Sequence, residues 1–107
     1  MNKFSFRYYL KHLKQPWEPF VLGVFNRHTI KLTYFKGIFH KHYHDTGDEV
    51  FVVIRGVINM GISNKNVILH VGDSYIVKRN EIHEPRSIKG AYVMTIEPEG
   101  TDPIFVD

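Results

Sequence analysis

The chain has 107 residues, of which 43% are hydrophobic and 14% aromatic, the composition of one folded domain with a single core. It contains no cysteine, which excludes disulfides, thiolate zinc sites and thiol catalysis. The start has no apolar signal region, and no run reaches the roughly 18 apolar residues of a membrane helix. We therefore expect a single domain over residues 1–107, located in the cytoplasm, with no membrane partner.

The net charge of +3 is unevenly distributed along the chain. Residues 1–41 carry eight Lys or Arg and one acid, whereas residues 42–107 carry six Lys or Arg and ten acids. Such a basic segment can bind nucleic acid or an anionic ligand, or it can be a solvated positive edge. Because no recognition-helix or base-stacking pattern accompanies the charge, we expect the solvated edge and no nucleic-acid partner.

The N-terminal segment, residues 1–16, is predicted to be helical. Phe6, Tyr9, Leu10 and Leu13 recur with a loose helical period. The helix should end at Gln15-Pro16, because the residue before proline disfavours helical backbone.

The rest of the chain reads as β-structure over residues 20–100. Short runs rich in Val, Ile, Phe, Tyr and Thr are separated by Gly, Asn and charged residues. The runs lie at residues 21–25, 29–35, 49–54, 57–62, 67–71, 74–77 and 91–97. Strands at this spacing, without intervening helices, predict an all-β antiparallel sandwich or barrel.

The run from Val50 to Ile54 is apolar on both faces. A strand of this kind is covered on both sides, one by the barrel interior and the other by a second sheet or a partner subunit. Together with the aromatic start of the chain, this apolar surface predicts a homodimer.

Three histidines and a glutamate are the candidate functional residues: His42, His44, Glu49 and His83, called here the His–Glu cluster. In a strand, residues two apart point to the same side, so His42 and His44 can converge on one point. This mixed nitrogen and oxygen set suits a divalent metal such as Mn, Fe, Co, Ni or Zn. The alternative is a metal-free polar cluster, in which a buried glutamate would be difficult to satisfy.

Other residues near the cluster in sequence are weaker candidates. His40 extends the alternating series, either as a group beside the metal ligands or as a residue at the barrel mouth. Tyr34 and Tyr92 carry a hydroxyl on a flat apolar body, which suits a small-molecule cavity as well as ordinary packing. His12, His28 and His70 have no partner pattern and are expected at the surface.

These residues together resemble the cupin superfamily. The first cupin motif is matched by Gly37, His42, His44, Glu49 and Gly56, and the second by Gly72 and His83. More closely, the chain resembles the small single-domain type-2 cupins labelled mannose-6-phosphate-isomerase-like, through Trp17, His83-x-Pro85 and Glu97-Pro98-x-Gly100-Thr101. It departs from the motifs at Lys78, Asn80 and Ser87, where the family usually has Pro, Gly and Asn. In addition, Gly37 lies one residue closer to the His pair than in the general motif.

The resemblance implies a double-stranded β-helix, or jelly-roll, barrel with a divalent metal inside it, held by the His–Glu cluster. It implies less about chemistry, because one fold hosts many functions. The leading hypothesis is a metal-binding cupin that binds or transforms a small metabolite. The alternatives are a non-catalytic ligand-binding or sensor module and a helper subunit that acts through protein contacts. The sequence dictates no separate acid or base, so it names no reaction.

Overall fold

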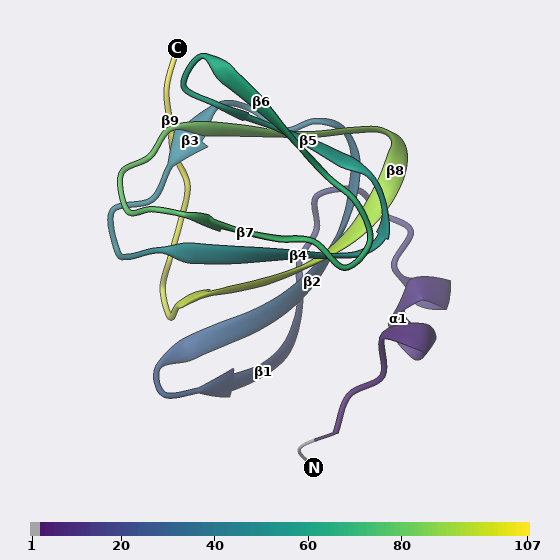
Figure 1. The fold of residues 1–107 in the computed structure, drawn as a ribbon. Coiled ribbons are helices and arrows are strands. Elements are labelled where there is room, and N and C mark those ends of the chain that lie inside the picture. The colour runs from purple at the N-terminus through teal and green to yellow at the C-terminus, as the bar shows by residue number, and fades with distance from the viewer. Residues whose placement is uncertain (1–2) are drawn as a thin grey trace.

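The computed structural model describes residues 3–107, so the first two residues of the expected N-terminal segment lie outside the described part. Over this range the chain forms one helix and nine strands (Figure 1), namely α1 (Phe6–His12), β1 (Phe20–Phe25), β2 (His28–Ile38), β3 (His42–Tyr43), β4 (Glu49–Gly56), β5 (Ile58–Ile62), β6 (Lys65–Leu69), β7 (Ser74–Val77), β8 (His83–Pro98) and β9 (Ile104–Phe105). All paired strands are antiparallel. The predicted all-β antiparallel architecture with a short N-terminal helix is confirmed.

Strand β8 connects the two halves of the barrel. Its first part pairs with β5, β3 and the end of β2, as in the pair of His42 with His83. Its second part pairs with β2 and β4, where Val93 lies opposite both Thr33 and Val53. The sequence predicted only residues 91–97 of this strand. It missed residues 83–90 because Pro85 and the alternating charged side chains there do not resemble a typical strand.

Two glycines allow β4 and β8 to approach at the bend. Gly56 and Gly90 have φ values of 87° and 99°, which side-chain-bearing residues rarely adopt. A Cβ atom on Gly56 would strike the carbonyl oxygen of Gly90. The corner of the barrel therefore depends on glycine at this position.

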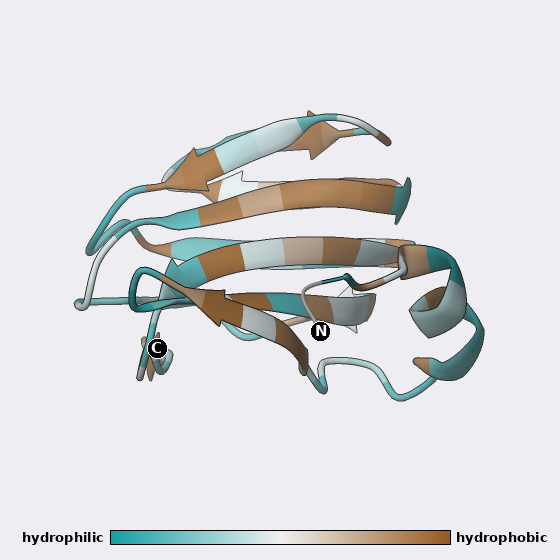
Figure 2. Ribbon diagram, turned by 90° about the horizontal axis from the view of Figure 1, so that it is seen from below, coloured by the Kyte–Doolittle hydropathy of each residue, from teal (hydrophilic) through white to brown (hydrophobic). Residues whose placement is uncertain are grey.

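The core lies inside the barrel, and brown apolar segments run along the strands while the connections are mostly teal (Figure 2). Its buried side chains come from six strands and are Phe35, Phe51, Val53, Ile58, Met60, Ile62, Leu69, Val77, Ala91 and Val93. In β4, Phe51 and Val53 point into this core, whereas Val50, Val52 and Ile54 are only half-buried. One face of the run from Val50 to Ile54 is therefore buried in the barrel, and the side chains on its other face remain partly exposed.

The N-terminal segment packs on the outside of the sheet. Helix α1 ends well before Pro16, and the Tyr92 hydroxyl donates a hydrogen bond of 2.9 Å to the Leu13 carbonyl. Tyr9 packs against Phe20 of β1 with ring centroids 4.6 Å apart. Within residues 3–107, no helix has the length and apolar character needed to cross a membrane.

Candidate metal centre and cavity

The His–Glu cluster is assembled by strand pairing at one end of the barrel. His42 in β3 lies directly opposite His83 in β8, with imidazole centroids 4.2 Å apart. His44 follows β3 on the same side, and its ring lies 4.9 Å from that of His42. Glu49 is the first residue of β4. All four side chains are buried, so residues distant in sequence converge on one enclosed point.

A backbone carbonyl fixes the orientation of each imidazole. The Nδ1 atoms of His42, His44 and His83 donate to the carbonyls of residues 40, 102 and 81, at 2.7, 3.2 and 3.0 Å. Because a carbonyl oxygen can only accept, each Nδ1 must carry the proton. In the neutral ring, each Nε2 then has no proton, and its lone pair is available to bind a metal.

The atoms facing one another in the cluster are all electron-pair donors. One nitrogen from each of the three imidazoles fits within a group whose atoms lie no more than 4.8 Å apart. The Oε1 atom of Glu49 lies 3.2 Å from His44 Nε2 and 3.8 Å from His83 Nε2. These three atoms are buried and have no hydrogen-bond partner within residues 3–107. A cation between them would satisfy all three at once, so the residues present fit a metal ion.

The protonation of the three imidazoles differs because their surroundings differ. Burial lowers the pKa of His83 to about 3, and it also lowers the pKa of His42. Burial acts in the same direction on His44, but contact with the Glu49 carboxylate and its charge outweigh it and raise the His44 pKa above the ordinary value. In the absence of metal, His44 is therefore the ring that holds a proton most readily.

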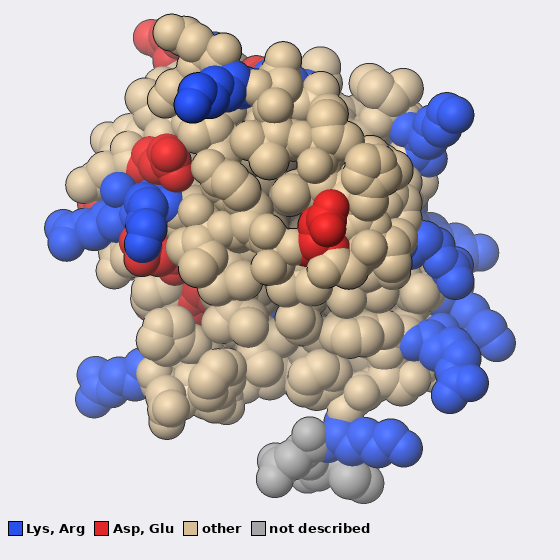
Figure 3. Space-filling model, in the orientation of Figure 1, with Lys and Arg blue, Asp and Glu red and all other residues tan. Residues whose placement is uncertain are grey.

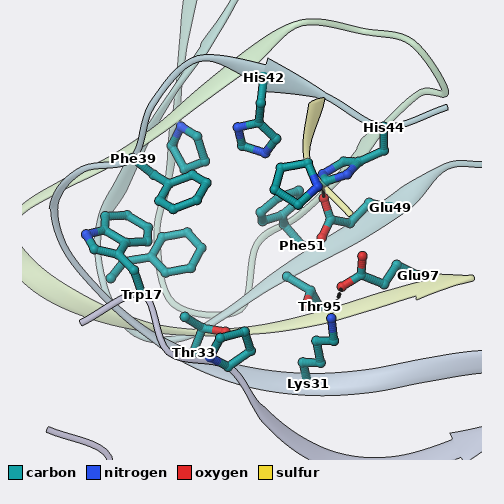
Figure 4. A pocket seen from close by; sticks show the side chains of 14 residues that line it. Trp17, Lys31, Thr33, Phe39, His42, His44, Glu49, Phe51, Thr95 and Glu97 are labelled. Atoms are coloured by element: carbon teal, nitrogen blue, oxygen red, sulfur yellow. Dashed lines mark ion pairs between the residues drawn. The ribbon is translucent and has the colours of Figure 1, made fainter. Parts of the chain in front are cut away.

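A cavity of about 120 Å³ opens onto the cluster from the barrel mouth (Figure 4). One side is formed by the aromatic wall, which we define as Trp17, Phe35, Phe39 and Phe51. Another side is formed by the polar wall of Lys31, Thr33, Thr95 and Glu97 from β2 and β8. His42, His44 and Glu49 line the same cavity, so a molecule inside it can reach the metal position.

The polar wall contains an ion pair that sequence reasoning missed. Lys31 Nζ lies 3.1 Å from Glu97 Oε1, and Glu97 is only 5% exposed. Burial, followed by the charge of Glu49, raises the pKa of Glu97, and the Lys31 ammonium opposes this shift. The signal was present in the two predicted strands, because Lys31 and Thr33, like Thr95 and Glu97, are two residues apart and share a face.

The weaker candidates lie outside the cavity lining. Tyr34 and Tyr92 stack on each other at 4.9 Å on the opposite face of β2 and β8, where Tyr92 anchors the N-terminal segment. The period of two that turns Thr33 inward turns these tyrosines outward. The His40 ring bonds the carbonyl of Val106, and only the His40 backbone carbonyl touches the cluster. His12, His28 and His70 are exposed, as the sequence predicted.

The family model described as "Cupin domain" matches residues 36–97, more than half of the chain and both motifs. The chain belongs to the cupin family. An uncharacterized protein of Bacillus subtilis, YdbB, is 23% identical over 96 residues, which are 89% of this chain and 85% of that protein.

Solved cupin structures share the fold. A cupin-2 domain protein from Shewanella frigidimarina is 28% identical, with a TM-score of 0.88 over 92% of this chain and 96% of that one. Hydroquinone 1,2-dioxygenase from Sphingomonas sp. TTNP3, solved with 4-hydroxybenzoate bound, is 13% identical, with a TM-score of 0.73 over 81% of this chain and 68% of that one. At that identity the second likeness concerns the fold alone.

Proposed function

We propose that this cupin holds a divalent metal ion on His42, His44, Glu49 and His83, and that the metal binds or acts on a small molecule in the cavity. One observation carries the proposal. Three buried atoms, Nε2 of His44 and His83 and Oε1 of Glu49, face one another and have no hydrogen-bond partner within residues 3–107. Leaving such groups unpaired costs free energy, and a cation removes that cost.

The donor set indicates which metals suit the site. Imidazole nitrogens with one carboxylate oxygen favour Mn, Fe, Co, Ni or Zn over Mg or Ca, which prefer oxygen ligands. The backbone carbonyls of residues 40, 81 and 102 support this role, because they hold the three rings with Nε2 facing inward. A metal bound here would supply a Lewis acid beside the ligand.

Elemental analysis of protein purified without chelator tests the proposal directly. We expect about one of these metals per chain at neutral pH, since one set of four ligands makes one site. Protein that takes up none of the five when each is offered in excess would contradict the metal site.

A non-catalytic ligand-binding module is the second candidate. Among the described residues that line the cavity, the titratable side chains besides the cluster are Lys31 and Glu97, and these two are paired with each other. Because Lys31 and Glu97 neutralise each other, this pair can hold a ligand as readily as it can transfer a proton. Turnover of a bound ligand that depends on Glu49 would identify an enzyme, whereas reversible binding without turnover would identify a carrier or sensor.

We also infer that a second copy of this chain covers the edge of β1. Among the strands of residues 3–107, β1 pairs only with β2. It contains no charged residue, although Phe20, Val21, Val24 and Phe25 are each at least 40% exposed. Free edges usually carry charges that prevent pairing, so an uncharged apolar edge favours a covered one. The surface over the β1–β2 hairpin is mostly free of charged side chains, which lie mainly at its margins (Figure 3). Two copies related by a two-fold axis can pair there without repulsion.

A further inference from the structure

The cavity has two chemically different walls that converge on the His–Glu cluster (Figure 4). Because they lie on either side of one small space, together they restrict the shape and chemistry of what can bind. The inference below rests on the proposed metal site and concerns the class of ligand that the site takes.

The aromatic wall is a rigid, flat platform. The Trp17 ring lies 4.5 Å from Phe35 and 5.2 Å from Phe39, centroid to centroid. The Trp17 backbone N–H donates to the Tyr34 carbonyl, and the indole Nε1–H donates to the Lys36 carbonyl, each at 2.8 Å. Since both N–H groups of Trp17 are already satisfied, its ring is fixed and offers only apolar surface to the cavity.

The polar wall presents a donor and an acceptor side by side. The Lys31 ammonium uses one N–H toward Glu97 and has two more, while the second carboxylate oxygen of Glu97 can accept. Lys31 lies directly opposite Thr95 in the β2–β8 pairing, so the threonine hydroxyl is adjacent. A ligand hydroxyl fits this arrangement, because it can accept from Lys31 and donate to Glu97. A ligand carboxylate would instead be repelled by Glu97.

The ion pair is not explained by stability alone. Glu97 is 5% exposed, and desolvation offsets much of the attraction within a buried pair, so apolar residues can often replace such a pair without loss of stability. Thr33 and Thr95 extend the polar strip along the cavity, beside the pair. A strip of this kind on one wall, facing an aromatic platform, is suited to orienting a ligand.

Volume and charge limit the ligand further. The cavity of about 120 Å³ is close to the roughly 150 Å³ cavity that holds a benzene ring. With neutral imidazoles, a divalent ion and Glu49 leave a single positive charge at the centre, and Lys31 and Glu97 cancel each other. One anionic oxygen on the ligand would balance that charge.

We propose that the cavity binds a flat, ring-sized monoanion that carries a hydroxyl. The anionic oxygen meets the metal on the His–Glu cluster, the ring lies against Trp17 and Phe39, and the hydroxyl bonds to Lys31 and Glu97. The polar pair therefore selects hydroxylated ligands over analogues that lack only the hydroxyl.

Isothermal titration of the metal-loaded protein with benzoate, 3-hydroxybenzoate and 4-hydroxybenzoate tests this selection. We expect at least one hydroxylated probe to bind about tenfold or more tightly than benzoate, as a hydrogen bond to a charged group provides. In Lys31→Met the ratio should fall to near one. Lys65→Met, which removes an exposed lysine on β6, should keep the wild-type ratio. If Lys31→Met fails to fold because Glu97 loses its partner, the double variant Lys31→Met/Glu97→Leu removes both charges and serves in its place.

The result separates the two proposals, because metal content is measured on the same samples. If the protein holds no metal, the proposed function fails and this inference with it. If the metal is bound but no probe binds, the ligand class is wrong while the metal site stands. The same holds if the hydroxyl gives no advantage, or if the advantage survives in both Lys31 variants.

Discussion

His44 and Glu49 face each other across 3.2 Å, from Nε2 to Oε1, at the buried end of the cavity. The other ring nitrogen of His44 donates to the Asp102 carbonyl, so its proton is already engaged. Nε2 of His44 and Oε1 of Glu49 therefore point lone pairs at each other, unless a cation lies between them. That cation can be a second proton on His44 or a metal ion. This choice between a proton and a metal determines how the site responds to mutation and pH.

Loss of any metal-binding side chain of the His–Glu cluster should weaken metal binding. His83→Ala and His42→Ala should weaken metal affinity by about 100-fold or more. Even loss of a residue that only orients a metal ligand lowers metal affinity by about 10- to 100-fold. Glu49→Gln should also weaken it, because it removes the one negative ligand while keeping the side-chain shape. Competition with a metal-binding dye measures each affinity. His70→Ala, at an exposed histidine on the same molecule, is the matched control and should bind as the wild type does. Equal affinities for all the variants would place the metal elsewhere.

The cluster was predictable from the sequence because strand geometry and motif spacing pointed to the same residues. His42 and His44 are two apart, and the positions of Glu49 and His83 match the cupin motifs. The positive φ of 67° at Asn80, where the family usually has Gly, is also the conformation that asparagine tolerates.

The cavity walls were less predictable, because they depend on which face of a strand points inward. The alternation along β2 places Thr33 inside and Tyr34 outside, whereas the sequence alone left the tyrosines open as cavity residues or as ordinary packing. The Lys31–Glu97 pair joins two strands whose register no local pattern reveals. The two-residue strand β9 was missed because it is too short to show a period, and β3 was expected only from the spacing of His42 and His44.

The metal-free protein should lose stability as pH falls below about 6.5. The folded pKa of His83 is about 3, whereas an unfolded chain has an ordinary histidine, so between these values the unfolded state binds more protons. The stability due to neutral His83 is thus fully present above pH 6.5 and is lost progressively toward pH 3. His42, whose pKa is also lowered, adds to the loss, while His44, whose pKa is raised, partly opposes it.

Urea unfolding of chelator-treated protein at several pH values measures this slope. One extra proton bound by the unfolded state corresponds to about 1.4 kcal/mol of unfolding free energy per pH unit. His83→Asn should reduce the slope by about that amount, since it removes the group that is neutral only in the folded state. Parallel slopes for the two proteins would show that His83 does not titrate on unfolding.

The exposed edge of β1 predicts the oligomeric state. Light scattering at micromolar concentration should give twice the 12.6 kDa monomer mass for the wild type. Val24→Lys puts a charge on the edge at a side chain already 55% exposed, so it should yield a folded monomer. Ile88→Lys changes an isoleucine that is 76% exposed at the bend of β8 and should remain dimeric. A wild-type monomer, or a dimer that persists in Val24→Lys, would exclude β1 as the interface.

Three glycine-to-alanine variants separate backbone strain from close approach. Gly23 has ordinary φ and open space, so Gly23→Ala should change the free energy of unfolding little. Gly72 has a φ of 90° with open space, and Gly72→Ala should cost about 1–3 kcal/mol from strain alone. Gly56 has a φ of 87° and no room beside the Gly90 carbonyl, so Gly56→Ala should cost more than Gly72→Ala. The urea midpoint should therefore be highest for Gly23→Ala, lower for Gly72→Ala and lowest for Gly56→Ala. A Gly56→Ala midpoint equal to that of Gly72→Ala would mean that the bend can open without cost.

Metal binding near neutral pH should release no more than about one proton, although the site has three histidines. His42 and His83 have lowered pKa values and are already neutral there, whereas the pKa of His44 is raised by Glu49, so only His44 has a proton for the metal to displace. Calorimetric titration with Zn²⁺ in buffers of different ionisation enthalpy counts the protons released. Glu49→Gln provides the sharpest comparison, because without the carboxylate His44 loses the group that raises its pKa. The variant should therefore bind metal more weakly and release fewer protons per metal. Release of two or three protons by the wild type would mean that His42 and His83 are charged before the metal arrives, contrary to the burial of both rings.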